Sequence, residues 1–521
     1  MMLATVSGAQ NPSDACTSIM VGKGASADGS VMTSHTCDSW YRTWMQSVAP
    51  ADYPRDTVMS VYEGRMHTEY PGSLDGMKEK GTIPQARHTY RFLDTAYPCL
   101  NERQLAIGET TYSGLDTMVN KEGMFMIEEL QRVALQRCST AREAIKLMGR
   151  LIKEYGYGDG GECLTIADPN EVWIFEVQGE GPKKKGGVWA AVRIPDDHIA
   201  VSANVSRIGK LNLKDTLNYM ASENVKDVAR KMGLWDGKGE FSFWKAYSKG
   251  NYMKEPKNYS VRELFIMNEL APGAGFNENM EELPLSVRPE RKVSVEDVAR
   301  LLGSYYEGTA MNLSGRLKVK NTKKKEGDGP EVPDSVVSPV ANPWMQPDEI
   351  AVYEALGDSA MHNIRTVSVP WCAYSTIIQC RSWLPDGVGG VAWICLDNPG
   401  QSPRFPVFAG VTDLPAMLKI CGQHRTRDDA ALWHYRKANK LATVRWGDAR
   451  KTLEPARDHF LKKGRLELPA IENEYRRLLD AGEKEEAARL LTDYTRDFFG
   501  ATIVRWDELG DSYWRERWKG F

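Results

Sequence analysis

The run Cys16-Thr17-Ser18-Ile19-Met20-Val21-Gly22, followed by Ala27-Asp28-Gly29-Ser30, decides how this chain is interpreted. The first run is short and rich in strand-forming residues, and the second has the composition of a tight turn. Another strand-like run, Val31 to Ser34, begins directly after the turn. The pattern predicts two strands joined in a hairpin, which folds the later Asp38 back toward Cys16.

Cys16 also follows a short leader, residues 1–15. The leader has an apolar start without a basic segment, and it ends in the small-x-small pattern Ser13-Asp14-Ala15, which is typical of a signal-peptidase site. Removal of the leader would make Cys16 the first residue, with its thiol beside a free α-amine. We therefore expect a periplasmic or secreted protein, with a cytoplasmic location as the alternative. A disordered tail in front of a structural cysteine is the other interpretation.

An N-terminal cysteine would carry its own proton acceptor. A free α-amine titrates near ~8, so it can take the thiol proton directly or through one water. Such a nucleophile requires no catalytic histidine. This chemistry is the first functional hypothesis that the residues themselves support.

Composition excludes several other classes of function. The chain has 521 residues, 42% of them hydrophobic, and a formal net charge of -3, which gives no electrostatic reason to expect a nucleic-acid partner. Its 9 cysteines contain no C-x-x-C pair and its 8 histidines show no metal-ligand spacing, so we expect no metal and no cofactor. No run approaches the ~20 apolar residues of a membrane span.

The order of elements predicts an α+β fold. A buried strand is expected at 105–112, followed by helices around 123–138 and from 140, where Thr140 and Glu143 have the spacing of a capping box. Further strands are expected at 163–167, 172–177, 188–193 and 198–204, in one antiparallel meander, and at 376–383 and 391–396. The charged stretch Lys318 to Asp334 is expected to be an exposed loop, and helices are expected at 430–444, 448–463, 468–481 and 483–499.

Three motifs resemble one known family. They are the opening at Cys16 with Asp28-Gly29-Ser30 and Asp38, the run Glu109-Thr110-Thr111, and the run Ala203-Asn204-Val205-Ser206-Arg207-Ile208. Together they resemble the dipeptidase A family of cysteine peptidases, relatives of the secernins among the N-terminal-nucleophile hydrolases, over residues 16–450. More distantly, the chain is similar to choloylglycine hydrolases and penicillin V acylases.

The resemblance implies a four-layer αββα sandwich of two antiparallel sheets between helices, with Cys16 at the end of a central strand. It divides the chain into a leader (1–15), a hydrolase domain (16–426) and a helical C-terminal extension packed on that domain (427–521). The helical extension leaves homo-oligomerisation open, because its amphipathic surface could contact a second subunit or cover the sandwich.

The resemblance also implies roles for single residues. Cys16 would be the nucleophile, Asp38 would hold the thiol or the ammonium in register, and Asn204 would donate to the oxyanion. Aligned with the acylases, an arginine is replaced by His35 and an oxyanion-hole asparagine by Thr111, while Arg381 is the candidate for a late arginine. Thr111 and Glu109 are candidates for substrate contact, since Glu109 would suit a substrate ammonium, and Arg207 would suit a substrate carboxylate. His35 and Arg381 are further candidates for substrate binding.

The activity implied is hydrolysis of dipeptides or short peptides, with self-cleavage of the leader where no signal peptidase acts. One alternative is an amidase or acylase of the same chemistry that cleaves N-acyl amides. A second alternative is a non-enzymatic protein, either secernin-like or lipid-anchored at Cys16. Ser13 and Asp14 disfavour lipidation, because the residue three before a lipidated cysteine is usually leucine.

Overall fold

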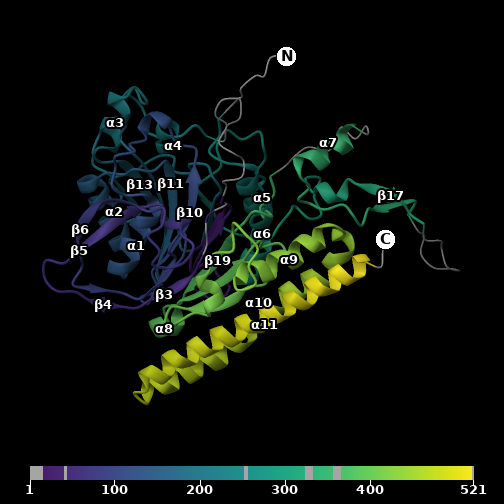
Figure 1. The fold of residues 1–521 in the computed structure, drawn as a ribbon. Coiled ribbons are helices and arrows are strands. Elements are labelled where there is room, and N and C mark those ends of the chain that lie inside the picture. The colour runs from purple at the N-terminus through teal and green to yellow at the C-terminus, as the bar shows by residue number, and fades with distance from the viewer. Residues whose placement is uncertain are drawn as a thin grey trace.

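Two antiparallel β-sheets form the centre of the fold (Figure 1). The structure is a computed structural model, and it describes residues 16–39, 41, 44–250, 256–322, 333–355 and 365–518. In spatial order, the seven-stranded sheet contains β16 (Ser286–Val287), β14 (Ile199–Ser202), β1 (Ser18–Val21), β2 (Val31–Cys37), β19 (Tyr374–Cys380), β20 (Val391–Leu396) and β21 (Phe405–Phe408).

The second sheet has eight strands. Their spatial order is β15 (Tyr219–Ala221), β13 (Val188–Ile194), β12 (Val172–Gln178), β11 (Gly161–Ala167), β10 (Ala106–Tyr112), β9 (Leu100–Asn101), β8 (Phe92–Asp94) and β3 (Gln46–Val48). Three small ribbons pair β4 (Ala51–Asp52) with β7 (His88–Thr89), β5 (Val58–Glu63) with β6 (Lys78–Pro84), and β17 (Lys318–Lys320) with β18 (Ser335–Val337).

The two large sheets pack against each other, with β2 on β10 and β11. Hydroxyl groups bridge them: the Oγ1 atoms of Thr33 and Thr165 lie 2.6 Å apart, and Thr110 Oγ1 lies 2.6 Å from Ser202 Oγ. A Cβ atom on Gly108 would come within 2.4 Å of the Ser34 carbonyl oxygen. The close approach of β10 to β2 therefore requires a glycine at this position.

Helices connect and cover the sheets. They are α1 (Ile127–Arg137), α2 (Ala141–Tyr155), α3 (Val225–Lys231), α4 (Phe243–Tyr247), α5 (Val261–Leu270), α6 (Val295–Leu302), α7 (Pro347–Ala355), α8 (Asp386–Gly389), α9 (Ala431–Thr443), α10 (Trp446–Asp480) and α11 (Lys484–Trp518). Helix α2 packs on β12 of the eight-stranded sheet, whereas α9, α10 and α11 pack on β20 and β21 (Figure 1). None of the helices described is long and apolar enough to span a bilayer.

The mixed fold, its antiparallel pairing and its helical C-terminal region confirm the sequence expectations at that level. Local predictions also hold: β1 and β2 form the expected hairpin, and the Thr140 side chain accepts from the Glu143 amide at 3.3 Å to cap α2. The Glu143 carboxylate accepts from the Ser139 amide and the Ser139 hydroxyl, each at 2.9 Å. Residues 323–332 of the expected charged loop lie outside the described residues, and β17 and β18 flank them.

One strand assignment is wrong. The expected four-strand meander ends after β13, because β14 belongs to the other sheet and pairs with β1 and β16. The turn before β14 carries the chain from one sheet to the other, and the Gly22 amide donates to the His198 carbonyl at 3.0 Å. A Cβ on Gly22 would lie 2.4 Å from the Asp196 carbonyl, so glycine permits this crossing.

The C-terminal helices also differ from expectation. The two helices expected at 448–463 and 468–481 form one continuous helix, α10, with Pro455 and Pro469 inside it. Gly464, at the expected break, lies against the indole of Trp393, where a Cβ would come within 2.7 Å of the ring. This glycine permits close packing on β20 and does not end the helix.

Candidate active site

Cys16 lies two residues before β1, with only 4% of its surface exposed. The hairpin pairing brings the end of β2 beside it. Thr36 Oγ1 accepts from the Thr17 amide at 2.8 Å and donates to Asp38 Oδ2 at 2.8 Å. One hydroxyl therefore ties the residue after Cys16 to Asp38, as the hairpin pattern predicts.

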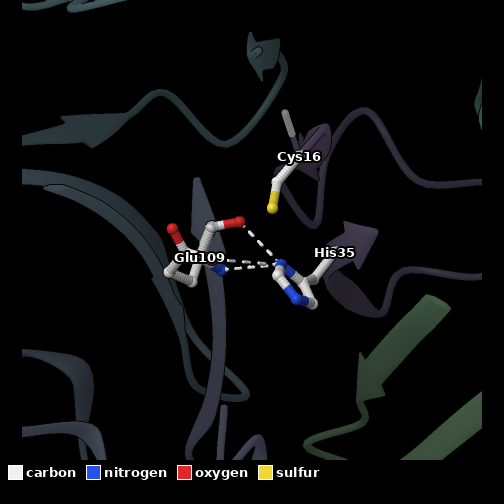
Figure 2. Close-up of side chains that lie close together, drawn as sticks. All are labelled: Cys16, His35 and Glu109. Atoms are coloured by element: carbon white, nitrogen blue, oxygen red, sulfur yellow. Dashed lines mark hydrogen bonds and ion pairs between the residues drawn. The ribbon is translucent and has the colours of Figure 1, made fainter. Parts of the chain in front are cut away.

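Three side chains converge at the thiol (Figure 2). Cys16 Sγ, a ring nitrogen of His35 and a carboxylate oxygen of Glu109 all lie within 4.8 Å of one another. His35 Nδ1 lies 2.6 Å from the Glu109 carbonyl oxygen. Because a carbonyl only accepts, we assign the ring proton to Nδ1, which leaves Nε2 as a bare acceptor.

The surroundings oppose charge on both His35 and the thiol. Burial lowers the pKa of His35 to about 4, so the ring is neutral at physiological pH. Burial also raises the pKa of the Cys16 thiol well above its usual range, and the nearby Glu109 and Asp38 carboxylates raise it further. The thiol of the intact chain is protonated, and a nucleophilic role requires a proton acceptor beside it.

Asp38 is fully buried and held from two sides. Its Oδ2 atom accepts from Thr36 Oγ1 and from Arg365 Nη2, each at 2.8 Å. Its Oδ1 atom is buried and has no hydrogen-bond partner among the described residues. The site thus contains a carboxylate oxygen with free accepting capacity, next to the main chain that carries Cys16.

Asn204 has a left-handed backbone with φ 66°, just after β14. Its Nδ2 atom donates to the Thr111 carbonyl at 2.6 Å, and its Oδ1 accepts from Arg262 Nη2 at 2.8 Å. An amide nitrogen carries two hydrogens, so one N–H of Asn204 is not used by the Thr111 bond. The residue is therefore anchored and still able to donate.

Arg262 is a site residue that the sequence reasoning missed. Its Nη1 atom donates to the Cys16 carbonyl at 2.7 Å and to Thr17 Oγ1 at 2.9 Å, so it fixes the main chain that bears the thiol. It stands in the first turn of α5, where Ser260 and Glu263 form a capping box, a pattern that signals a helix start but not this contact. Burial lowers the pKa of Arg262 to about 10.

Thr111 and Glu109 lie on the same face of β10. Thr111 Oγ1 donates to Glu109 Oε1 at 3.3 Å, and Thr111 is the cross-strand partner of Glu162 on β11. Burial, with Asp159 nearby, raises the pKa of Glu109 to about 7, and burial beside Glu109 raises the pKa of Glu162 well above its usual range. Glu162 was not predicted as a site residue from the sequence.

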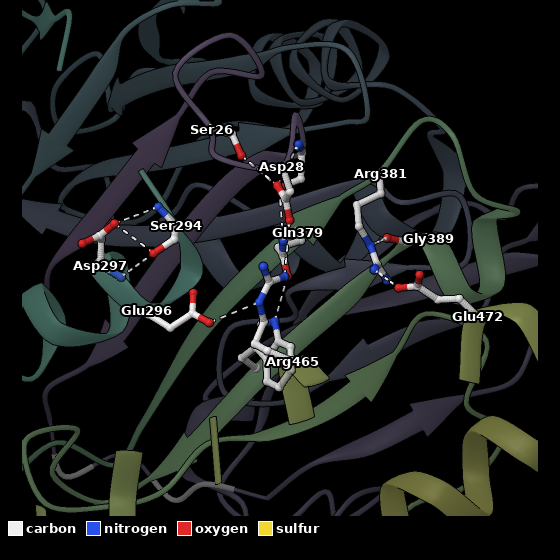
Figure 3. Close-up of polar contacts among 12 residues, drawn as sticks. Ser26, Asp28, Ser294, Glu296, Asp297, Gln379, Arg381, Gly389, Arg465 and Glu472 are labelled. Atoms are coloured by element: carbon white, nitrogen blue, oxygen red, sulfur yellow. Dashed lines mark hydrogen bonds and ion pairs between the residues drawn. The ribbon is translucent and has the colours of Figure 1, made fainter. Parts of the chain in front are cut away.

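The two remaining predicted residues, Arg207 and Arg381, bind other parts of the protein. Arg207 donates to the carbonyl oxygens of Val201, Asn258 and Pro284. Arg381 forms an ion pair with Glu472 of α10 and donates to the carbonyls of Val388 and Gly389 (Figure 3). Their described contacts do not join them to the Cys16 cluster, so their substrate-binding roles stay predictions.

Cys16, His35 and Glu109 are also residue types that bind metal ions. In the described part of the chain, they form the one group of three or more such side chains close enough to share an ion. His35 Nδ1, 3.9 Å from Glu109 Oε2, is already engaged with the Glu109 carbonyl. Three side chains with one nitrogen engaged offer fewer donors than the four of a structural zinc site.

Known proteins are similar in sequence to this chain over most of its length. The model of the family described as Peptidase family C69 matches residues 15–459, a range that begins one residue before Cys16. A probable dipeptidase of Latilactobacillus sakei is 30% identical over 437 residues, which cover 81% of this chain and 79% of the relative. A probable dipeptidase of Salmonella dublin is 27% identical over 418 residues, covering 76% and 81%. A dipeptidase of Bifidobacterium longum is 23% identical over 440 residues, covering 78% and 73%.

Proposed function

Because the chain belongs to peptidase family C69, we propose that it is a cysteine dipeptidase with Cys16 as the first residue of the mature protein. The observation that carries the proposal is the buried Cys16 thiol two residues before β1, close enough to the Asp38 carboxylate for the latter to raise its pKa, while Asp38 Oδ1 has no partner among the described residues. The dipeptidase names of the relatives support the substrate class.

In the intact chain the nitrogen of Cys16 is an amide and has no basic lone pair. Cleavage of the Ala15–Cys16 bond turns it into an amine within the same residue as the thiol. Asp38 Oδ1 would accept a hydrogen bond from the resulting ammonium, and Arg262 holds the Cys16 carbonyl in place. Proton acceptor and nucleophile would then share one fixed segment of main chain.

The reaction follows in two halves. The α-amine takes the proton from Sγ, and the thiolate attacks the scissile carbonyl carbon to give a tetrahedral oxyanion, to which the free N–H of Asn204 would donate. The ammonium returns the proton to the leaving nitrogen, the C–N bond breaks, and a thioester remains. Water, deprotonated by the same amine, then attacks the thioester and releases the acid and the thiol.

The fold supports the same assignment. We propose that the two facing sheets and their outer helices form the four-layer αββα sandwich of N-terminal-nucleophile hydrolases. The packing of β2 on β10 and β11, of α2 on β12 and of α11 on β21 supports these layers. In this arrangement Cys16 would stand at the end of a central strand, since β1 lies between β14 and β2.

Mass spectrometry of the N-terminus, combined with dipeptide hydrolysis, tests the proposal. We expect the active protein to begin at an unmodified Cys16, and we expect Cys16→Ala to abolish hydrolysis while leaving the circular dichroism spectrum unchanged. Cys138→Ala, at another buried cysteine, is the matched control and should retain activity. Hydrolysis by a protein with an intact Ala15–Cys16 bond would contradict the mechanism.

A further inference from the structure

Three buried oxygen atoms, one of them on Glu109 of the Cys16 cluster, have no hydrogen-bond partner among the described residues. They are Glu109 Oε2, Glu162 Oε2 and the hydroxyl of Tyr157. Buried polar atoms without partners are uncommon in folded proteins, and each one that remains requires an explanation. Here all three can accept a hydrogen bond, and two belong to carboxyl groups.

The strand register brings these groups together. Glu162 pairs with Thr111 across β10 and β11, and Glu109 stands two residues before Thr111, so both carboxyl groups project from the same face of the sheet. Each carboxyl group perturbs the pKa of the other, and Glu162 in turn acts on Tyr157. Figure 2 shows Glu109 beside Cys16 and His35, and a carboxylate oxygen of Glu109 lies within 4.8 Å of Cys16 Sγ.

The charges around this group are mostly negative. Asp159 is close enough to act on both Glu162 and Tyr157, and Glu128 is close enough to act on Tyr157. Arg65, which lies close enough to act on Glu128, pairs with Glu129, and Arg132 pairs with Asp94 at 2.5 Å. His35 faces Glu109 Oε2 at 3.9 Å but is neutral at physiological pH.

Buried carboxyl groups normally have a cation or several donors as partners, because an unpaired buried charge is costly. Among the described residues, no arginine or lysine forms an ion pair with Glu109 or Glu162. An ammonium group carries one positive charge and three N–H donors. It matches both the missing charge and the number of free acceptors.

We propose that Glu109, Glu162 and Tyr157 form an ammonium subsite that binds the free α-amino group of the residue whose carbonyl Cys16 attacks. This inference rests on the proposed function, and it assigns the substrate class: dipeptides with an unblocked N-terminus. It also gives Glu162 and Tyr157 a role in specificity that no sequence motif indicates.

Covalent geometry supports the assignment. The α-nitrogen of an amino acid lies about 2.5 Å from its own carbonyl carbon, since two bonds of about 1.5 Å separate them. A nucleophile attacks from roughly 3–3.5 Å. A carboxylate oxygen of Glu109 within 4.8 Å of Cys16 Sγ is therefore in reach of the ammonium of a residue under attack.

The subsite would make substrate preference the property that distinguishes a dipeptidase from the alternative acylase. An N-acyl group removes the positive charge and two of the three donors, so the buried acceptors stay unpaired when such a substrate binds. Sites built to pair with a polar group reject analogues that lack it by up to ~10⁴–10⁵-fold in kcat/KM. We expect at least ~10²-fold lower kcat/KM for an N-acetyl dipeptide than for the same free dipeptide.

Steady-state kinetics with alanyl-alanine and N-acetyl-alanyl-alanine test the proposal. We expect Glu162→Gln to raise KM for the free dipeptide at least ~10-fold, with a smaller change in kcat. The ratio of kcat/KM for the free dipeptide to kcat/KM for the acetylated dipeptide should therefore fall. Glu176→Gln is the matched control, because burial also raises the pKa of Glu176 to about 7 but Ser206 and the Arg207 amide hold its carboxylate. That variant should keep the wild-type preference.

Equal hydrolysis of both substrates by the wild-type protein would overturn the subsite without requiring any variant. An equal loss for both substrates in Glu162→Gln would also overturn it. These outcomes are distinguishable from a failure of the proposed nucleophile. In that case Cys16→Ala would stay active, and the preference for a free amine would be measurable in the same assay.

Discussion

At the scale of single residues, Asn204 has a backbone conformation that most side chains avoid. Its φ of 66° lies in the left-handed region, which asparagine tolerates better than most residues. Its side chain joins the end of β14 to Thr111 of β10 and to Arg262 of α5. Strain of this kind next to a candidate nucleophile is a common feature of functional sites.

Two substitutions separate the conformational role of Asn204 from a catalytic one. Asn204→Gly relieves the backbone strain, whereas Asn204→Ala keeps it at a cost of about 1–2 kcal/mol. We expect both variants to lose ~10²–10³-fold in kcat, because neither can donate to an oxyanion. Denaturant unfolding should find Asn204→Gly the more stable of the two. A wild-type kcat in Asn204→Gly would show that Asn204 has a structural role and no catalytic one.

Glu109 predicts a pH dependence with a defined sign. An unfolded glutamate loses its proton near pH 4.5, but in the folded chain Glu109 keeps it until about pH 7. Between these values the folded state binds more protons, so the contribution of Glu109 to the free energy of unfolding falls as pH rises. The groups that act on it are Glu162, Asp159, Thr111 and Cys16, with His35 beside it.

We therefore expect the melting temperature of the wild-type protein to fall between pH 4.5 and 7 relative to that of Glu109→Gln. Binding of a dipeptide's ammonium group should have the opposite pH dependence, since it requires the ionised Glu109 carboxylate. KM for a dipeptide should rise as pH falls below about 7. Thermal melts and initial rates across this pH range measure both effects. Parallel melting curves for the two proteins would show that Glu109 titrates normally.

Sequence motifs identified only part of this site. Cys16, Asp38, Glu109 and Asn204 stand in or beside short recognisable runs. Arg262 and Arg365 do not, because their partners lie 246 and 327 residues away in the chain. Glu162 lies one residue before the strand expected at 163–167, and only the register with Thr111 places it near Glu109.

At the scale of elements, the predictions that held depend on neighbouring residues, and those that failed depend on distant ones. The hairpin of β1 and β2 and the cap of α2 are encoded within a few residues. The sheet that β14 joins is decided by β1, which lies far earlier in the chain. Gly464, at the expected break in α10, packs closely against Trp393 of β20, a contact far away in the sequence.

Two glycines in the long C-terminal helices provide a matched test of that packing. Replacing a helical glycine by alanine usually stabilises a helix by about 1 kcal/mol. Gly500→Ala in α11 should show this gain, because nothing lies within 4 Å of the added Cβ. Gly464→Ala should instead lose about 1–3 kcal/mol, since the Cβ meets the buried indole of Trp393. Urea unfolding measures the free energy of unfolding of both variants. A higher value for Gly464→Ala than for the wild type would show that α10 can shift away from Trp393.

At the scale of the whole molecule, the C-terminal helices are joined to the site by a chain of polar contacts. Trp506 Nε1 of α11 donates to Asn439 Oδ1 of α9 at 3.1 Å, and Asn439 Nδ2 donates to Asp397 Oδ2 at 2.8 Å. The Asp397 amide donates to the Ala373 carbonyl, and the Ala373 amide donates to the Cys37 carbonyl at 2.7 Å. Cys37 directly precedes Asp38, so the helical layer supports the strand end that carries the proposed catalytic carboxylate.

This continuity predicts that the helices and the sheets unfold together. Trp506 is fully buried, so Trp506→Ala should cost about 3–5 kcal/mol. Trp514 of the same helix is 65% exposed, and Trp514→Ala should stay within about 0.5 kcal/mol of wild type. Circular dichroism melts recorded alongside residual dipeptidase activity should give one transition, shifted downward only in Trp506→Ala. Two separate transitions, with activity surviving the first, would show that α11 folds as an independent appendage.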